Sequence, residues 1–159
     1  MAWGVGTGWE VRTTGLATNG GGWNPDNATK GTDWSQQDAA KATMVVSCDG
    51  STTVTRGSGT VFSADLVANG IYIINDASAA SLFEIVSRSD DSTIVVDRTP
   101  GVTTAKTAYV GGAQSNITTV LADVPAASAS GANTVWIKGG TTYLQGTNFT
   151  TTVQFVTAG

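Results

Sequence analysis

The residues that most often carry out catalysis or bind metals are scarce in this sequence. It contains no histidine, which removes the commonest general base, the commonest metal ligand and every histidine-dependent catalytic triad. The single cysteine, Cys48, excludes an intramolecular disulfide and a cysteine-based zinc cluster. We expect Cys48 to be a small buried or half-buried side chain. Any catalytic chemistry would therefore depend on carboxylates.

Twelve aspartates and glutamates are present, so a carboxylate pair of the glycosidase kind is the remaining catalytic option. Asp90 and Asp91 are adjacent, but they occupy a polar turn between two predicted strands, where acidic side chains are usually solvated. Asp26, Asp33 and Asp38 flank a glycine-rich loop and offer oxygen ligands for calcium, but their spacing matches no calcium-binding loop. We therefore expect no catalytic residues, no metal site and no cofactor.

Five tryptophans are the other residues whose chemistry suggests binding. Aromatic faces stack on sugar rings, and tryptophans also anchor protein interfaces. Trp9 and Trp136 lie in predicted strands and are expected in the core. Trp3 and Trp23 lie in an arm and a loop, and we take them, together with Trp34, as candidate interface residues. The alternatives are a place in the core, above all for Trp34, and a sugar-binding platform.

The composition favours strands and turns and limits the range of partners. Charged residues make up only 13% of the 159 residues and 20 are glycines, which is typical of a β-rich chain. The net charge of −4 and the lack of a lysine or arginine cluster argue against binding to nucleic acid or to an anionic membrane. The first eight residues lack the basic and apolar regions of a signal peptide, and no apolar run is long enough to span a membrane.

The two ends of the sequence predict one structural unit. Residues 9–13 alternate, with Trp9 and Val11 on one face and Glu10 and Arg12 on the other, as in a half-buried strand. A bare strand over residues 134–138 is the expected partner. Residues 1–8 are predicted to form a flexible arm that docks on a neighbour.

A long loop over residues 15–31 separates the first strand from a predicted helix. Its Asn19-Gly20-Gly21-Gly22 run lacks the pattern of a phosphate-binding or dinucleotide-binding loop and is interpreted as a turn. The helix is expected to open near Asp33, with Gln36 completing a capping box. One small, largely apolar face of this helix is expected to be formed by Ala39, Ala40, Thr43 and Met44.

From residue 45 to residue 112 the apolar residues recur with a period of two, which indicates strands separated by turns. The expected strands cover residues 53–56, 59–62, 71–75, 82–88, 92–97 and 107–110. A polar turn over residues 88–92 predicts a hairpin. Five or six short antiparallel strands are typical of a compact barrel or sandwich.

A second helix is expected over residues 115–123, and strands over 141–144 and 149–155. The domain organisation predicted from these elements is an arm (1–8), a helix-capped β base (9–44 and 113–159) and an inserted antiparallel subdomain (45–112). The expected fold class is mainly β, with a β-helix-like or sandwich base that carries a small inserted barrel or sandwich.

Several short motifs resemble the N-terminal module of bacteriophage right-handed parallel β-helix proteins. In that module a V-R-T-T-G-like strand end is followed by a T-N-G-G-G loop and an S-Q-Q-D-A-A helix, which correspond here to residues 11–15, 18–22 and 35–40. A later G-x-N/D-T-V-W-I-K-x-G rung corresponds to residues 131–140. The segment between resembles a small β insert of such phage proteins, through residues 59–67, 83–86, 93–98 and 110–112.

The resemblance implies a virion protein, because phage tailspikes, fibres and head-surface proteins use such folds, often as trimers. The sequence leaves room for only one or two rungs after residue 136, so a glycan-cleaving groove is not expected. The resemblance therefore implies a non-enzymatic capsid decoration (cement) protein, trimeric and bound to the major capsid protein or another virion protein. Virion assembly in the host cytoplasm agrees with the lack of a signal peptide.

Two other interpretations remain open from the sequence. The chain could be an attachment module of a tail fibre, tailspike or baseplate, which would bind tail components rather than the head. It could also be a carbohydrate-binding or carbohydrate-cleaving β protein, an interpretation that depends on the tryptophans alone. Locating the protein on intact particles separates the first two, and a glycan array tests the third.

Overall fold

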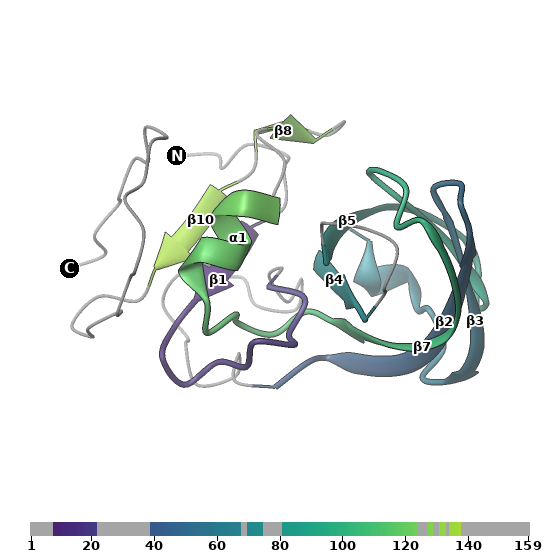
Figure 1. Ribbon diagram of the computed structural model, residues 1–159, viewed down its shortest axis with the longest axis horizontal. Helices are drawn as coiled ribbons and strands as arrows, with labels where there is room; N and C mark the ends of the chain where they lie inside the picture. The colour runs from purple at the N-terminus through teal and green to yellow at the C-terminus, as the bar shows by residue number, and fades with distance from the viewer. Residues whose placement is uncertain are drawn as a thin grey trace.

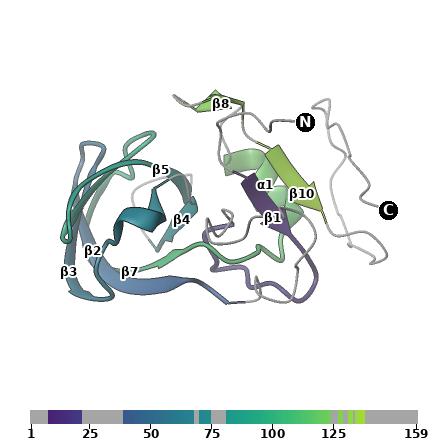
Figure 2. The ribbon, with the colours of Figure 1, turned by 180° about the vertical axis from the view of Figure 1, so that it is seen from behind.

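The computed structural model describes residues 8–21, 39–67, 70–74, 81–123, 127–128, 131–132 and 134–137. These residues are mainly in strands, and the only α-helix among them is short. Figure 1 shows two parts side by side, a barrel and a smaller base, and Figure 2 shows the same arrangement from behind. The expectation of a mainly β chain is confirmed.

Six strands form the barrel, and every neighbouring pair is antiparallel. They are β2 (Ala42–Asp49), β3 (Thr53–Gly59), β4 (Gly70–Ile73), β5 (Leu82–Asp90), β6 (Thr93–Val96) and β7 (Val102–Val110). Their hydrogen-bonded order is β2-β3-β6-β5-β4-β7, and β7 returns to β2 and closes the barrel. The β4-β5-β6 meander is thus flanked by β3 and β7 in a Greek-key arrangement, and closure leaves no free sheet edge.

The barrel interior is filled by alternate side chains of its strands. In β2, for example, Met44, Val46 and Cys48 are buried, whereas the residues between them are partly or fully exposed. Phe62 and Leu66 add to this core from the segment that joins β3 to β4, which includes the 3-10 helix η2 (Ala64–Leu66). Because the strands place apolar side chains inward with a period of two, the barrel has its own contiguous core.

The base joins the two ends of the described chain. Strand β1 (Gly8–Val11) pairs in parallel with β10 (Thr134–Ile137), and helix α1 (Ile117–Asp123) packs against β1. The short pair β8 (Ala127–Ser128) and β9 (Gly131–Ala132) lies between them in the chain. The predicted pairing of the first strand with residues 134–138 is therefore confirmed.

A second hydrophobic core holds the base together and connects it to the barrel. It contains Trp9 and Val11 from β1, Ile117 and Val120 from α1, and Leu82 from the barrel strand β5. All five side chains are buried. Because Leu82 belongs to both parts, the base and the barrel share apolar contacts rather than only a linker.

Several local expectations are confirmed and others are wrong. The hairpin around residues 88–92 joins β5 to β6, and the helix expected over residues 115–123 is α1. The predicted helical face that ends at Thr43 and Met44 is wrong, because β2 begins at Ala42. The strand expected over residues 59–62 is also wrong, because β3 ends at Gly59, where φ is 85°.

Other expectations concern residues outside the described part of the chain. These are the arm before Gly8, the helix start at Asp33 with Gln36, and the strands expected over residues 141–144 and 149–155. They stay predictions.

Candidate functional site

The structure describes few of the side chains that the sequence singles out for binding. Trp3, Trp23 and Trp34 lie outside the described residues, as do Asp26, Asp33 and Asp38. Trp9 is fully buried in the core of the base, as expected from its strand. The three candidate interface tryptophans therefore stay predictions.

Asp90 and Asp91 occupy the hairpin turn and make local contacts there. The Ser92 amide donates a hydrogen bond to Asp90 Oδ1 at 2.7 Å, which closes the turn, and the Arg88 guanidinium forms an ion pair with Asp91. Both aspartates are exposed. Across the part of the chain that the structure describes, no group of three or more Asp, Glu or Cys residues is placed to hold a metal ion.

A pocket of about 360 Å³ lies where three neighbouring barrel strands meet, with β2 in the middle and β3 and β7 on either side. Five of its lining residues carry hydroxyl groups, namely Ser47, Thr53, Thr55, Thr103 and Thr104. The exposed Asp49 carboxylate and the Val102 side chain, which is 67% exposed, complete the lining. The pocket volume is at the lower end of the range for small-molecule sites, about 300–1,000 Å³.

The pocket wall is shaped by a bulge in β7. The register between β2 and β7 shifts between Val46 and Cys48, and opposite this shift Ala105 has a φ of 53°. Ala105 is the only non-glycine residue with positive φ among those the structure describes. Its amide donates a hydrogen bond to Ser47 Oγ at 3.0 Å. A left-handed alanine costs about 1–2 kcal/mol, so the surrounding contacts hold this segment in a strained shape.

The electrostatics of the pocket are set by one carboxylate. The Ser51 amide donates to Asp49 Oδ1 at 2.9 Å, and hydrogen bonds from Ser51 lower the pKa of Asp49 below its usual value. Asp49 is therefore ionised at neutral pH. None of the lining side chains is basic, so the pocket carries a single negative charge.

Two buried side chains lie at the pocket directly across the β2–β7 ladder from each other, Cys48 and Thr103. Burial, with a smaller contribution from the nearby Asp49 charge, raises the pKa of Cys48 to about 11. The thiol is thus protonated at neutral pH and is a poor nucleophile. Thr103 is 6% exposed, and its Oγ1 has no hydrogen-bond partner among the described residues.

A second candidate region is the junction between the base and the barrel, where three glycine backbones meet. Gly20 donates its amide to Gly111 O at 2.9 Å, and Gly111 donates to Gly70 O at 2.9 Å. A Cβ atom on Gly20 would lie 2.1 Å from Gly70 O. The glycine run that the sequence presents as a turn is therefore a packing contact that only glycine can make.

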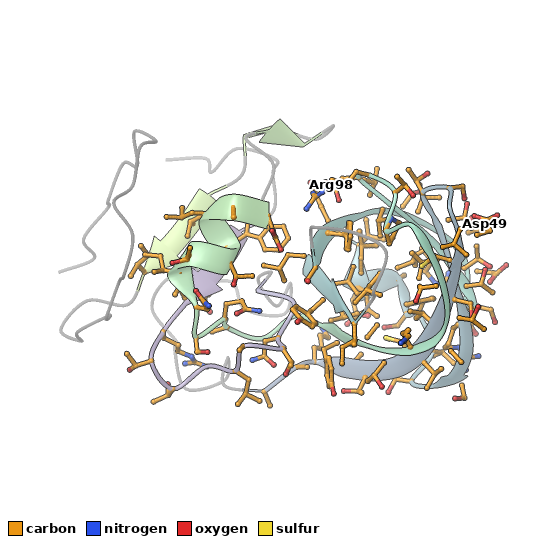
Figure 3. All side chains as sticks on the ribbon, viewed as in Figure 1. Asp49 and Arg98 are labelled. Carbon is orange, nitrogen blue, oxygen red and sulfur yellow. The ribbon has the colours of Figure 1, made fainter. Side chains whose placement is uncertain are left out.

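Arg98 connects the base to the barrel on the other side of this junction. Its guanidinium donates to the carbonyl oxygens of Leu82 and Asp123, forms an ion pair with Asp97 and lies 4.9 Å from the centre of the Phe83 ring. Asp123 ends α1, and its Oδ2 accepts hydrogen bonds from the amides of Ser81 and Leu82. Figure 3 shows Arg98 on the side of the barrel that faces the base, and Asp49 on the far side.

The polar face of β1 is buried rather than solvated. Glu10 and Arg12 are 0% and 1% exposed, so the half-buried strand expected from their alternation with Trp9 and Val11 is wrong. The loop after β1 is fixed against the chain that follows β7, because Gln114 Nε2 donates to Ala17 O and Asn19 O. These residues build the base.

The pocket is the described region best suited to binding. It offers hydroxyl groups, one carboxylate and an apolar side chain, but no pairing of a nucleophile with a base. Hydrogen bonding to a ligand is therefore the chemistry it supports. The sequence contains no motif for it, because its residues come from three strands and are brought together by the barrel register and a bulge.

No helix in the described part of the chain is long and apolar enough to cross a membrane. Comparison with known proteins adds no relative: no protein-family model, no curated protein and no solved structure matches this chain.

Proposed function

We propose that this chain is a non-enzymatic structural protein of a bacteriophage particle, which decorates the capsid surface as a trimer. The proposal starts from the sequence motifs, which resemble the head module of phage β-helix proteins. The observation that supports it best is the parallel pairing of β1 with β10, in which Trp9 lies opposite Val135 and Val11 opposite Ile137. Val11, the first residue of the V-R-T-T-G-like motif, thus lies beside the strand of the later rung motif.

The second edge of β1 also carries parallel contacts. Gln114 donates its amide to Glu10 O and accepts from Arg12 N, both at 2.9 Å, in an isolated parallel bridge. Parallel contacts on both edges are what stacked rungs of a β-helix require. In the proposed function, this base is the part that attaches to the particle and the barrel projects from it.

The experiment is to purify the full chain and measure its mass in solution by sedimentation, then add it to phage particles that lack it. We expect a trimer that binds the particles at saturable sites on the head. A monomer without affinity for particles would contradict the proposal. Gold labelling of intact particles that marks the tail instead would replace capsid decoration with a tail attachment role.

The interface prediction is tested in the same assay with Trp23→Ala. We expect the variant to fold but to bind particles more weakly, because tryptophans often contribute strongly to protein interfaces. Leu16→Ala is the control, since Leu16 is an exposed side chain (52%) in the loop after β1. Equal binding by both variants would remove Trp23 from the interface.

A further inference from the structure

The pocket on the barrel wall has three features that a chance depression between strands does not require. Its lining includes five residues with hydroxyl groups and one carboxylate. It lies against Thr103, whose inward-facing and nearly buried Oγ1 has no partner among the described residues. It adjoins Ala105, which is held at a left-handed φ of 53° by the barrel. Strained backbone and unsatisfied polar groups are more frequent at functional sites than elsewhere.

The chemistry of the lining selects the class of ligand. Hydroxyl groups both donate and accept hydrogen bonds, and a carboxylate accepts two or more from vicinal hydroxyls. Phosphate and other anions are disfavoured, because Asp49 is ionised and no basic side chain lines the pocket. The exposed Val102 isopropyl group offers an apolar contact beside the polar ones.

We propose that this pocket binds one sugar unit of a neutral glycan, with Asp49 accepting hydrogen bonds from sugar hydroxyls and Val102 packing against the sugar's C–H face. Ser47, Thr55 and Thr104 supply the remaining hydrogen bonds. The proposal does not depend on the virion role, because it concerns the barrel alone and its test uses no particles. It also places sugar binding away from the tryptophans, all five of which lie outside residues 42–110.

The arrangement in space agrees with a surface that is free to meet a large ligand. Asp49 lies on the side of the barrel away from the base (Figure 3). A glycan held there would not meet β1, β10 or α1. The site and the base can therefore act at the same time.

The test is an NMR titration of the full, ¹⁵N-labelled chain with glucose, galactose, mannose and N-acetylglucosamine at millimolar concentration. We expect the amide signals of Ser47, Asp49, Thr55 and Thr104 to shift progressively with at least one of these sugars. No shift with any of them overturns the proposal. The titration is repeated with calcium and with sulfated sugars. Shifts that arise only in these repeats also overturn the proposal.

Asp49→Asn separates binding from folding. The amide oxygen still accepts the hydrogen bond from Ser51, so the turn is preserved, but the charge-assisted hydrogen bonds to sugar hydroxyls are lost. We expect affinity to fall about ten-fold, because such bonds are about twice as strong as neutral ones. Asp90→Asn is the matched control, since Asp90 Oδ1 makes the same turn contact with Ser92 away from the pocket. Equal affinity of the Asp49→Asn variant and the unchanged chain would overturn the role of Asp49.

Discussion

Gly20 illustrates how much of this fold depends on single residues without side chains. Its Cα approaches the backbone of Gly70 and Gly111 so closely that a methyl group has no room. The neighbouring contact, from Gly21 N to Gly112 O at 2.9 Å, repeats the arrangement one residue later. The loop after β1 is thus attached to the segment that follows β7 by backbone hydrogen bonds, in addition to those of the Gln114 side chain.

Gly20→Ala is expected to destabilise the protein by more than about 3 kcal/mol, because the added methyl group would overlap with backbone that cannot move aside. Gly57→Ala is the matched control. A Cβ atom on Gly57 would have Val45 O at 3.8 Å as its nearest contact, and φ is not in the left-handed region. We expect that change to alter stability by less than about 0.5 kcal/mol. The measurement is the midpoint of urea unfolding of both variants. Equal midpoints would show that the junction has room for a methyl group at Gly20.

Cys48 gives the barrel a specific dependence on alkaline pH. Burial raises the pKa of the folded thiol to about 11 from the ordinary 9.0, so the unfolded chain loses this proton first as the pH rises. The protonated thiol makes its full contribution to the free energy of unfolding below pH 9, and this contribution declines as the pH approaches 11. The slope is at most about 1.4 kcal/mol per pH unit.

This slope is measured by urea unfolding between pH 8 and pH 11, with Cys48→Ala as the control. The variant is expected to be less stable at neutral pH, because it leaves a small cavity, but to lose less stability on going to alkaline pH. The two proteins differ only in this side chain, so the effects of all other groups cancel in the comparison. Parallel pH profiles would show that the thiol ionises freely in the folded protein.

At the level of elements, Arg98 strengthens the contact between α1 and β5, because its planar guanidinium donates hydrogen bonds to carbonyl oxygens of both elements. Arg98→Lys keeps the charge but cannot reproduce this geometry, and we expect a loss of about 1–2 kcal/mol. Trp9 is buried in the base and no tryptophan lies within residues 42–110, so the fluorescence of Trp9 reports on the base, whereas circular dichroism reports mainly on the strands.

We therefore expect the Arg98→Lys variant to lose tryptophan signal at a lower urea concentration than its dichroism signal. Arg56→Lys is the matched control, because Arg56 also donates to two carbonyl oxygens, of Asp91 and Gly59, but at 3.2 and 3.3 Å on an exposed surface. Coincident transitions in the Arg98→Lys variant would show that the base and barrel unfold together without this contact.

The elements that the sequence predicts well are those with local signals. The β5–β6 hairpin follows from alternating residues around Asp90 and Asp91, and α1 follows from the spacing of Ile117 and Val120. The start of β2 could not be inferred, because small residues such as Ala42 and Thr43 suit either a helix or a strand. Barrel closure and the burial of Glu10 and Arg12 depend on contacts between distant segments, which a period of two does not specify.

The candidate site was less predictable than the fold. Sequence patterns single out residues of distinctive chemistry, hence the tryptophans and aspartates, whereas the pocket is made from ordinary serines and threonines. The signal that would have helped is the Thr103-Thr104 pair near the start of β7, which puts a threonine where a barrel strand should place an apolar side chain inward. Thr103 occupies such an inward position and leaves its hydroxyl group without a partner among the described residues.

At the level of the whole molecule, the barrel begins and ends at the same place. Ala42, the first residue of β2, pairs with Val110, the last residue of β7. The barrel also has its own core, separate from that of the base. We therefore expect a fragment of residues 39–113 to fold alone, with dispersed NMR signals and a cooperative thermal transition.

The fragment would be less stable than the full chain, because Tyr72 and Leu82 lose their contacts with the base. Replacing Leu82 by Thr in the fragment is expected to reduce self-association by removing an exposed apolar side chain from its surface. A fragment without a cooperative transition would show that the barrel requires the base for its stability.

The pairing of β1 with β10 also constrains how the protein is made. Strand β1 leaves the ribosome before the barrel, yet its parallel partner is separated from it by the whole barrel. Contacts between such distant segments form late, because they must first overcome the entropy of closing a long loop. During synthesis Trp9 and Val11 therefore lack their contacts with β10 while the barrel folds. We expect the nascent chain to be most prone to aggregation just before residues 134–137 emerge.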